Sequence, residues 1–171
     1  MIINLISFLG LVFGYYLTKI FKQELKDIEK FIIITMNIMI ILLIINLILI
    51  SGLSLTFIIA IVFGILTSLI IKNIYFYFGF ILVSSNIINI DTWFNITILI
   101  FIYGLLFSSV NFKKINLKFI LTNLILFLLP FILLLFKEFT LQNLSFMNVI
   151  LGFSIGGLIN GARFSFKKAK K

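Results

Sequence analysis

Residues 151–171 read LGFSIGGLINGARFSFKKAKK, an apolar stretch that carries four glycines and ends in a dense run of cations. Glycine is a poor helix former in water. Within a bilayer, burial of apolar surface no longer draws helices together, and small residues let two helix backbones approach closely. The stretch therefore predicts a membrane-embedded helix that packs against neighbouring helices and is followed by a basic tail.

The small residues of this segment form two rows. Residues spaced by four lie along one row of a helix, so two rows at different angles predict neighbouring helices on two sides. The remaining apolar residues are then expected to face lipid. The first row is Asn148, Gly152, Gly156 and Asn160, the second is Gly157 and Gly161, and the residues expected to face lipid are Leu151, Ile155 and Leu158.

The composition of the whole chain also points to a bilayer. Of its 171 residues, 63% are hydrophobic and 11% are charged, which leaves too little polar surface to cover a water-soluble core. The net charge is +9, but the cations lie in short patches between long apolar runs. This pattern suits loops that meet anionic lipid headgroups at the inner face, and it does not suit nucleic-acid binding. Because the chain contains no cysteine and no histidine, we predict no catalytic residue, no metal site and no cofactor.

Seven apolar segments are candidates to cross a hydrocarbon core about 30 Å thick. The fourth of them contains a cluster of serines and asparagines, so a re-entrant or interfacial segment is the alternative there. The seven segments are residues 2–18, 31–50, 53–71, 74–90, 93–110, 119–136 and 144–162.

The cations decide between these alternatives, because Lys and Arg in short loops stay on the cytoplasmic side. With seven spans and an outside N-terminus, all 14 Lys and Arg residues except Lys137 fall on the inner side. Deleting the fourth span would divide the cations between both faces. We therefore predict an all-α integral membrane protein of the cell membrane, a compact bundle of about seven transmembrane helices. Residues 1–171 form a single transmembrane domain, with the N-terminus outside and a basic cytoplasmic tail from about residue 163.

Small residues at four-residue spacing recur in two other segments. The first segment carries Gly10 and Gly14, and the third carries Ala60, Gly64 and Ser68. We interpret these residues as contacts between helices of the same chain. Contact with a second copy of the chain is the alternative.

A glycine precedes the basic inner edge of the first, fifth and seventh segments, at Gly14, Gly104 and Gly161. This pattern suggests that segments one to three and five to seven are parallel triplets joined by the fourth, an arrangement that some transporters use. The alternative is that any helix obeying the positive-inside rule shows the same pattern.

The polar groups expected inside the bilayer are amides and hydroxyls, because the acidic residues fall outside the apolar segments. Those of the fourth segment, with Pro130 loosening the sixth helix, lead to the hypothesis of a polar pocket open to the outer face. Hydrogen bonding between helices is the alternative role. Asparagines of the other segments are expected to turn inward or to pair with a neighbouring helix, because an amide facing lipid is costly. The pocket residues are Ser84, Ser85, Asn86 and Asn89, and the other asparagines are Asn37, Asn46, Asn123, Asn148 and Asn160.

The first segment carries the pattern G-x-x-x-G-Y-x-L-x-K-I, formed by Gly10, Gly14, Tyr15, Leu17, Lys19 and Ile20 and followed by Glu24 and Leu25. This run resembles the opening of small, uncharacterised multi-pass membrane proteins of archaea, and the resemblance implies no activity. The run is also similar to the start of the bacterial glycerol-3-phosphate acyltransferases that use acyl phosphate, which have seven spans and an outside N-terminus. The glycine-rich polar loops of that family are missing here, so its activity is not carried over.

These observations predict a polytopic membrane protein without catalytic activity, acting as an accessory or assembly subunit or as a small carrier. Its expected partners are the lipid bilayer and, for an accessory subunit, another membrane protein. The alternative is a membrane-embedded lipid-modifying enzyme. Such an enzyme would have to use acids such as Glu24 and Asp27 with neighbouring lysines.

Overall fold

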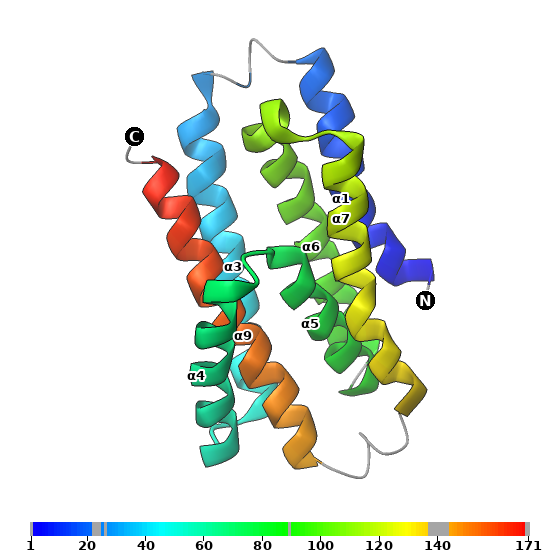
Figure 1. The fold of residues 1–171 in the computed structure, drawn as a ribbon, viewed down its shortest axis with the longest axis vertical. Coiled ribbons are helices and arrows are strands. Elements are labelled where there is room, and N and C mark those ends of the chain that lie inside the picture. The colour runs from blue at the N-terminus through cyan, green and yellow to red at the C-terminus, as the bar shows by residue number, and fades with distance from the viewer. Residues whose placement is uncertain (1, 22–24, 26, 89, 137–143, 170–171) are drawn as a thin grey trace.

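The computed structural model describes the chain except for residues 1, 22–24, 26, 89, 137–143 and 170–171. The described residues form helices and short connections (Figure 1). In chain order the helices are α1 (Ile2–Ile20), α3 (Glu29–Ser51), α4 (Leu55–Ile70), α5 (Ile74–Ile88), α6 (Ile90–Asn111), the 3-10 helix η1 (Phe112–Lys114), α7 (Leu117–Leu128), the 3-10 helix η2 (Leu129–Phe136) and α9 (Leu144–Ala169).

Three helical stretches of the described chain are long and apolar enough to cross a membrane, namely Glu29–Ser51, Trp93–Asn111 and Leu117–Leu135. They place this all-helical protein among membrane proteins. The other four predicted spans also form apolar helices, but these are shorter. At a rise of 1.5 Å per residue, the 16 residues of α4 extend about 24 Å, which is less than the thickness of a typical hydrocarbon core.

Helices α1 and α6 touch through their backbones. A Cβ atom added at Gly10 would collide with the carbonyl oxygen of Phe101, and one added at Gly14 would lie 2.5 Å from the carbonyl oxygen of Leu105. From the other side, a Cβ atom added at Gly104 would lie 2.8 Å from the backbone of α1. Only glycine permits this approach, which brings many backbone and side-chain atoms into dispersion contact.

Helices α4 and α9 form a second close pair of the same kind. A Cβ atom added at Gly64 or at Gly156 would collide with a backbone carbonyl of the opposite helix. One added at Gly152 would lie 2.5 Å from the carbonyl oxygen of Phe57. The glycine row of the seventh segment thus lies at the contact with α4.

Hydrogen bonds between side chains join both pairs at both ends. In each pair the two partners advance together along the chain, so both pairs are parallel. Trp93 Nε1 donates to Asn4 Oδ1 (2.6 Å), Thr18 Oγ1 donates to Ser109 Oγ (3.2 Å), Asn148 Nδ2 donates to Ser54 Oγ (3.4 Å) and Asn160 Nδ2 donates to Ser68 Oγ (2.8 Å).

The two pairs have similar sequence offsets. Their four hydrogen bonds join residues 89, 91, 94 and 92 positions apart. The helices of the first triplet begin at residues 2, 29 and 55, and those of the second begin at residues 90, 117 and 144, which are offsets of 88, 88 and 89. These similar offsets agree with the arrangement of two triplets, α1-α3-α4 and α6-α7-α9, with α5 between them.

The two triplets differ in their packing against helix α5. In the first triplet α3 packs against α6 and α9, whereas in the second α7 and η2 pack mainly against α5. Gly79 permits the close approach of α5 to α7 and η2. A Cβ atom at this position would collide with the carbonyl oxygen of Phe127 and would lie 3.0 Å from the ring of Pro130. The α-helical geometry of the sixth segment ends at Leu128, two residues before Pro130, as the sequence suggested.

One prediction about α9 is wrong. Leu151, Ile155 and Leu158 do not face lipid but are buried in the core of the bundle. The reason is that α9 contacts α3, α4 and α5, one neighbour more than its two small rows indicated. Gly157, in the second row, lies under the ring of Tyr77 of α5.

Replacing Gly156 with leucine should force α4 and α9 apart. We expect the G156L variant to lose about 1–3 kcal/mol of unfolding free energy, the usual cost of overpacking. The I159L variant is the matched control, because Ile159 lies on the same helix and is exposed. Circular dichroism during titration of mixed micelles with SDS measures both variants, and equal midpoints for G156L and I159L would contradict the close contact.

Candidate functional site

The connection between α4 and α5 does not reach the end of the bundle. Figure 1 shows α4 ending, and α5 starting, part-way along the long axis, well below the level at which α1 and α6 end. The connection is residues 71–73, and two of them, Lys72 and Asn73, are polar. Polar groups are thereby placed within the length of the helical bundle.

A polar cavity of about 300 Å³ lies between this turn and the start of α7. Its size is at the lower end of the range of ligand pockets, about 300–1,000 Å³. The lining residues combine amides, a hydroxyl, one aromatic ring and one cation, and no acidic residue is among them. They are Asn73, Asn116, Lys118, Phe119, Thr122 and Asn123.

Two asparagines hold the turn in place against α7. The side-chain oxygen of Asn73 accepts a hydrogen bond from the backbone N–H of Tyr75 (2.9 Å) and so caps the start of α5. Its Nδ2 donates to Oδ1 of Asn123 (2.8 Å). Asn123 is buried, and its own Nδ2 donates to the carbonyl oxygen of Phe119 (2.7 Å). These bonds order the back wall of the cavity.

The start of α7 and one lysine line the open side of the cavity. Asn116 caps α7, because its Oδ1 accepts from the backbone N–H of Phe119 (2.8 Å), and the first turn of α7 also lines the cavity. The start of a helix is the positive end of its dipole. Lys118 in that turn is exposed. A phosphate or carboxylate group would find an ammonium group, a helix start and amide groups here.

Tyr77 connects the α4–α5 turn to α9, on the side of the turn that faces away from α7. The hydroxyl of Tyr77 donates to the carbonyl oxygen of Ile71 (3.2 Å), and its ring lies against Gly157. A cavity of only about 10 Å³ remains there, which is about the space of one water molecule. The second glycine row of α9 thus makes room for the side chain that secures the turn.

The described residues of the predicted outer pocket, Ser84, Ser85 and Asn86, do not line the polar cavity. Ser84 and Ser85 are buried, and their hydroxyls donate to backbone carbonyls of their own helix, at Phe80 (2.8 Å) and Leu82 (3.1 Å). Asn86 is half-buried. Asn89 lies outside the described residues.

The other asparagines divide into two groups. Asn123, Asn148 and Asn160 pair with side chains of other elements, as predicted. Asn37 is buried and Asn46 is exposed, and the amide of each donates to the carbonyl oxygen four residues earlier in the same helix (both 2.9 Å). The prediction that every asparagine turns inward or pairs with a neighbour is therefore wrong for Asn46, whose own helix satisfies its N–H group.

The sequence reading missed Asn73, Asn116, Lys118 and Thr122 as members of one site. A usable signal was present, since Asn73 and Asn116 stand just before helix starts, where asparagine is favoured as a cap. Nothing in the sequence indicates that the α4–α5 turn lies part-way along the bundle beside α7.

One of the acids named for the alternative enzyme, Asp27, is exposed near the start of α3 and does not line this cavity. The other, Glu24, lies outside the described residues. Within the part of the chain that the structure describes, no group of three His, Cys, Asp or Glu residues is placed to hold a metal ion.

Comparison with known protein families, with curated protein sequences and with solved structures found no match for this chain. The resemblance of the first segment to small archaeal membrane proteins therefore stays a prediction. Any function has to be inferred from the geometry of the chain itself.

The Asn73–Asn123 contact should contribute to stability in a way that an exposed asparagine does not. The N123L variant leaves the amide of Asn73 without its acceptor, and we expect a loss of about 0.6 kcal/mol of unfolding free energy, the average for hydrogen bonds between membrane helices, and at most about 1.7 kcal/mol. The N46L variant should be neutral or stabilising, because Asn46 is exposed. Unfolding midpoints in mixed micelles compare the two, and an N123L variant as stable as N46L would show that the contact does not hold the turn.

Proposed function

We propose that the chain is a seven-helix integral membrane protein that acts as a small carrier for an anionic solute. In this proposal α1, α4, α5 and α9 cross the bilayer together with the three longer helices. Short helices can be accommodated by local thinning of the bilayer at a modest cost. Their close packing against the longer helices supports this arrangement, because α1 lies along α6 and α9 lies along α3.

The distribution of cations supports an orientation with the N-terminus outside. The end of α1, the start of α3 and the connection from α6 to α7 lie at one end of the bundle (Figure 1). These elements carry Lys19, Lys30, Lys113 and Lys118, and all four lysines are exposed. In a positive-inside arrangement this end is cytoplasmic, and the polar cavity then opens on the cytoplasmic side.

The observation that carries the proposal is the position of the α4–α5 turn. A polar connection lies part-way along an apolar bundle, beside a cavity lined by one lysine and no acid. Polar and ionisable groups at such a depth cost free energy and commonly mark functional sites. Many secondary transporters bind substrate near the middle of the membrane, at breaks between helices and between repeated halves. The two parallel triplets and the turn between them have these features. This comparison is one of architecture and does not identify a solute.

The residues that line the cavity favour a binding site over a catalytic site. The six residues that line it include an ammonium group, amides and a hydroxyl, and none of them is a general base suited to neutral pH. A lipid-modifying enzyme would need such a group at the site.

A small anion should stabilise the purified protein. We expect inorganic phosphate or succinate to raise the thermal unfolding midpoint above that in chloride of equal ionic strength, since one-site binding at 100 times Kd adds about 2.7 kcal/mol. The K118Q variant should lose this response. The K113Q variant should keep it, because Lys113 is also exposed at this end of the bundle but does not line the cavity.

The same variants distinguish a carrier from a binding subunit. A carrier should exchange labelled phosphate or succinate across proteoliposome membranes, with less exchange for K118Q than for K113Q. No response to any anion, or the same response in both variants, would contradict the proposal. Co-purification of another membrane protein in fixed stoichiometry, without any anion response, would instead favour an accessory subunit.

A further inference from the structure

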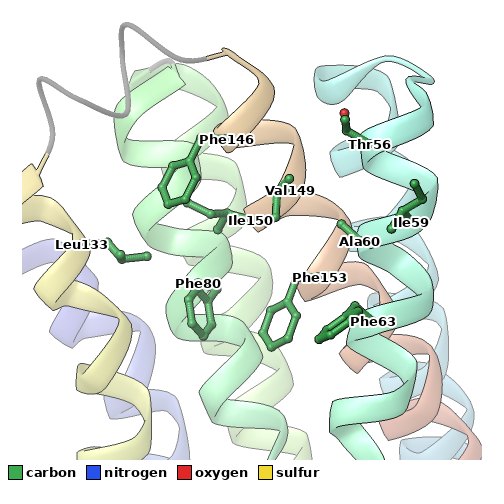
Figure 2. Close-up of a pocket in the computed structure, with 10 residues that line it drawn as sticks. All are labelled: Thr56, Ile59, Ala60, Phe63, Phe80, Leu133, Phe146, Val149, Ile150 and Phe153. Atoms are coloured by element: carbon green, nitrogen blue, oxygen red, sulfur yellow. The ribbon is translucent and has the colours of Figure 1, made fainter.

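A second cavity of about 460 Å³ lies between α4, α5, η2 and α9, as a groove in the surface of the bundle. Figure 2 shows α4 along one edge, α5 and η2 along the other, and α9 at the back. Its lining is apolar apart from the hydroxyl group of Thr56. Ile59 and Val149 are exposed within it, so the groove opens to the surroundings of the protein.

The groove lies where the packing of the two triplets differs. In the first triplet α3 packs against α9. The corresponding contact in the second triplet would place α7 and η2 on α4, but these elements pack against α5 instead. The flank of α4 that faces η2 is therefore left open, and Leu133 of η2 reaches only the far edge of the gap (Figure 2).

Aromatic rings close one end of the groove. Figure 2 shows Phe63, Phe153 and Phe80 in a row across it. The rings of Phe80 and Phe153 are in edge-to-face contact, with centroids 5.3 Å apart. These rings separate the groove from the level of the α4–α5 turn, so the groove and the polar cavity are independent features.

The other end of the groove has hydrogen-bonding groups beside it. Thr56 and Phe146 lie at this end in Figure 2, near the starts of α4 and α9. The hydroxyls of Thr56 and Ser54 are 3.0 Å apart, and Asn148 Nδ2 donates to Ser54 Oγ (3.4 Å). In the proposed orientation this end lies toward the outer face, where the ester groups of a lipid would be.

We propose that the groove binds one alkyl chain of a membrane lipid, with the ester region of the lipid beside Ser54, Thr56 and Asn148. An apolar groove on a membrane-spanning protein has to be filled by lipid or by another helix. A helix with its side chains is about 10–12 Å across and rises about 5.4 Å per turn, so the volume of the groove would hold about one turn. A thin, flexible alkyl chain fits this volume, and polar groups at only one end match an amphiphile. The proposal requires the bilayer but not the carrier activity.

Photo-crosslinking tests this assignment with the wild-type protein. The probe is a phosphatidylcholine with a diazirine on one acyl chain, present in trace amounts in vesicles of dioleoyl phosphatidylcholine. Ile59 in the groove and Ile45 on the outer half of α3 are matched, since 56% and 48% of their surfaces are exposed. After photolysis, peptide mass spectrometry should find several-fold more adduct at Ile59 than at Ile45. Equal labelling would overturn the proposal, because it would mean ordinary contact with bulk lipid at both sites.

A groove-filling variant gives a second readout. The V149W variant should reduce labelling at Ile59 to the level at Ile45, whereas I45W should leave labelling at Ile59 unchanged. Unchanged labelling of the groove in V149W would contradict a bound chain. Absence of adducts at Ile59 would show that another occupant, such as a second copy of the chain, keeps lipid out of the groove and would also overturn the proposal. Failure of the anion experiments would leave both labelling results unaffected.

Discussion

Two pairs of parallel helices make backbone contact, and these contacts position the rest of the chain. Gly10 and Gly14 permit the contact in one pair, and Gly64 and Gly156 permit it in the other. Lipid supplies no hydrophobic force between helices, so such contacts have to come from dispersion and hydrogen bonds at short range. In each pair, glycines set the distance between the axes and hydrogen bonds at both ends set the register. α1 is thereby fixed to α6, and α4 is fixed to α9.

Both cavities lie where the two triplets pack differently. α5 lies between the triplets, and α7 and η2 pack mainly against it. The polar cavity lies between the turn before α5 and the start of α7, beside Asn73 and Lys118, and the apolar groove lies between α4, α5, η2 and α9, beside Ile59. The proposed anion site and the proposed lipid site both depend on this packing.

The sequence predicted the helices and the small residues at their contacts, because apolar length and four-residue spacing are local properties. It did not predict that Leu151 and Leu158 are buried, since the number of neighbours around α9 depends on the whole bundle. It could not distinguish Asn160, which bonds to another helix, from Asn46, which bonds to its own, because both bonds satisfy the same amide. The polar cavity was missed for a related reason: residues from distant segments meet only after the α4–α5 turn is placed beside α7.

In the proposed arrangement of seven spans, the two ends of the chain lie on opposite sides of the bilayer. The chain contains no cysteine, and a single cysteine added before the first residue or after the last is then the only thiol. Labelling with a membrane-impermeant maleimide in intact and in lysed cells locates each end. The account predicts that the N-terminal cysteine is labelled in intact cells and the C-terminal cysteine only after lysis. Two ends on the same side would contradict it.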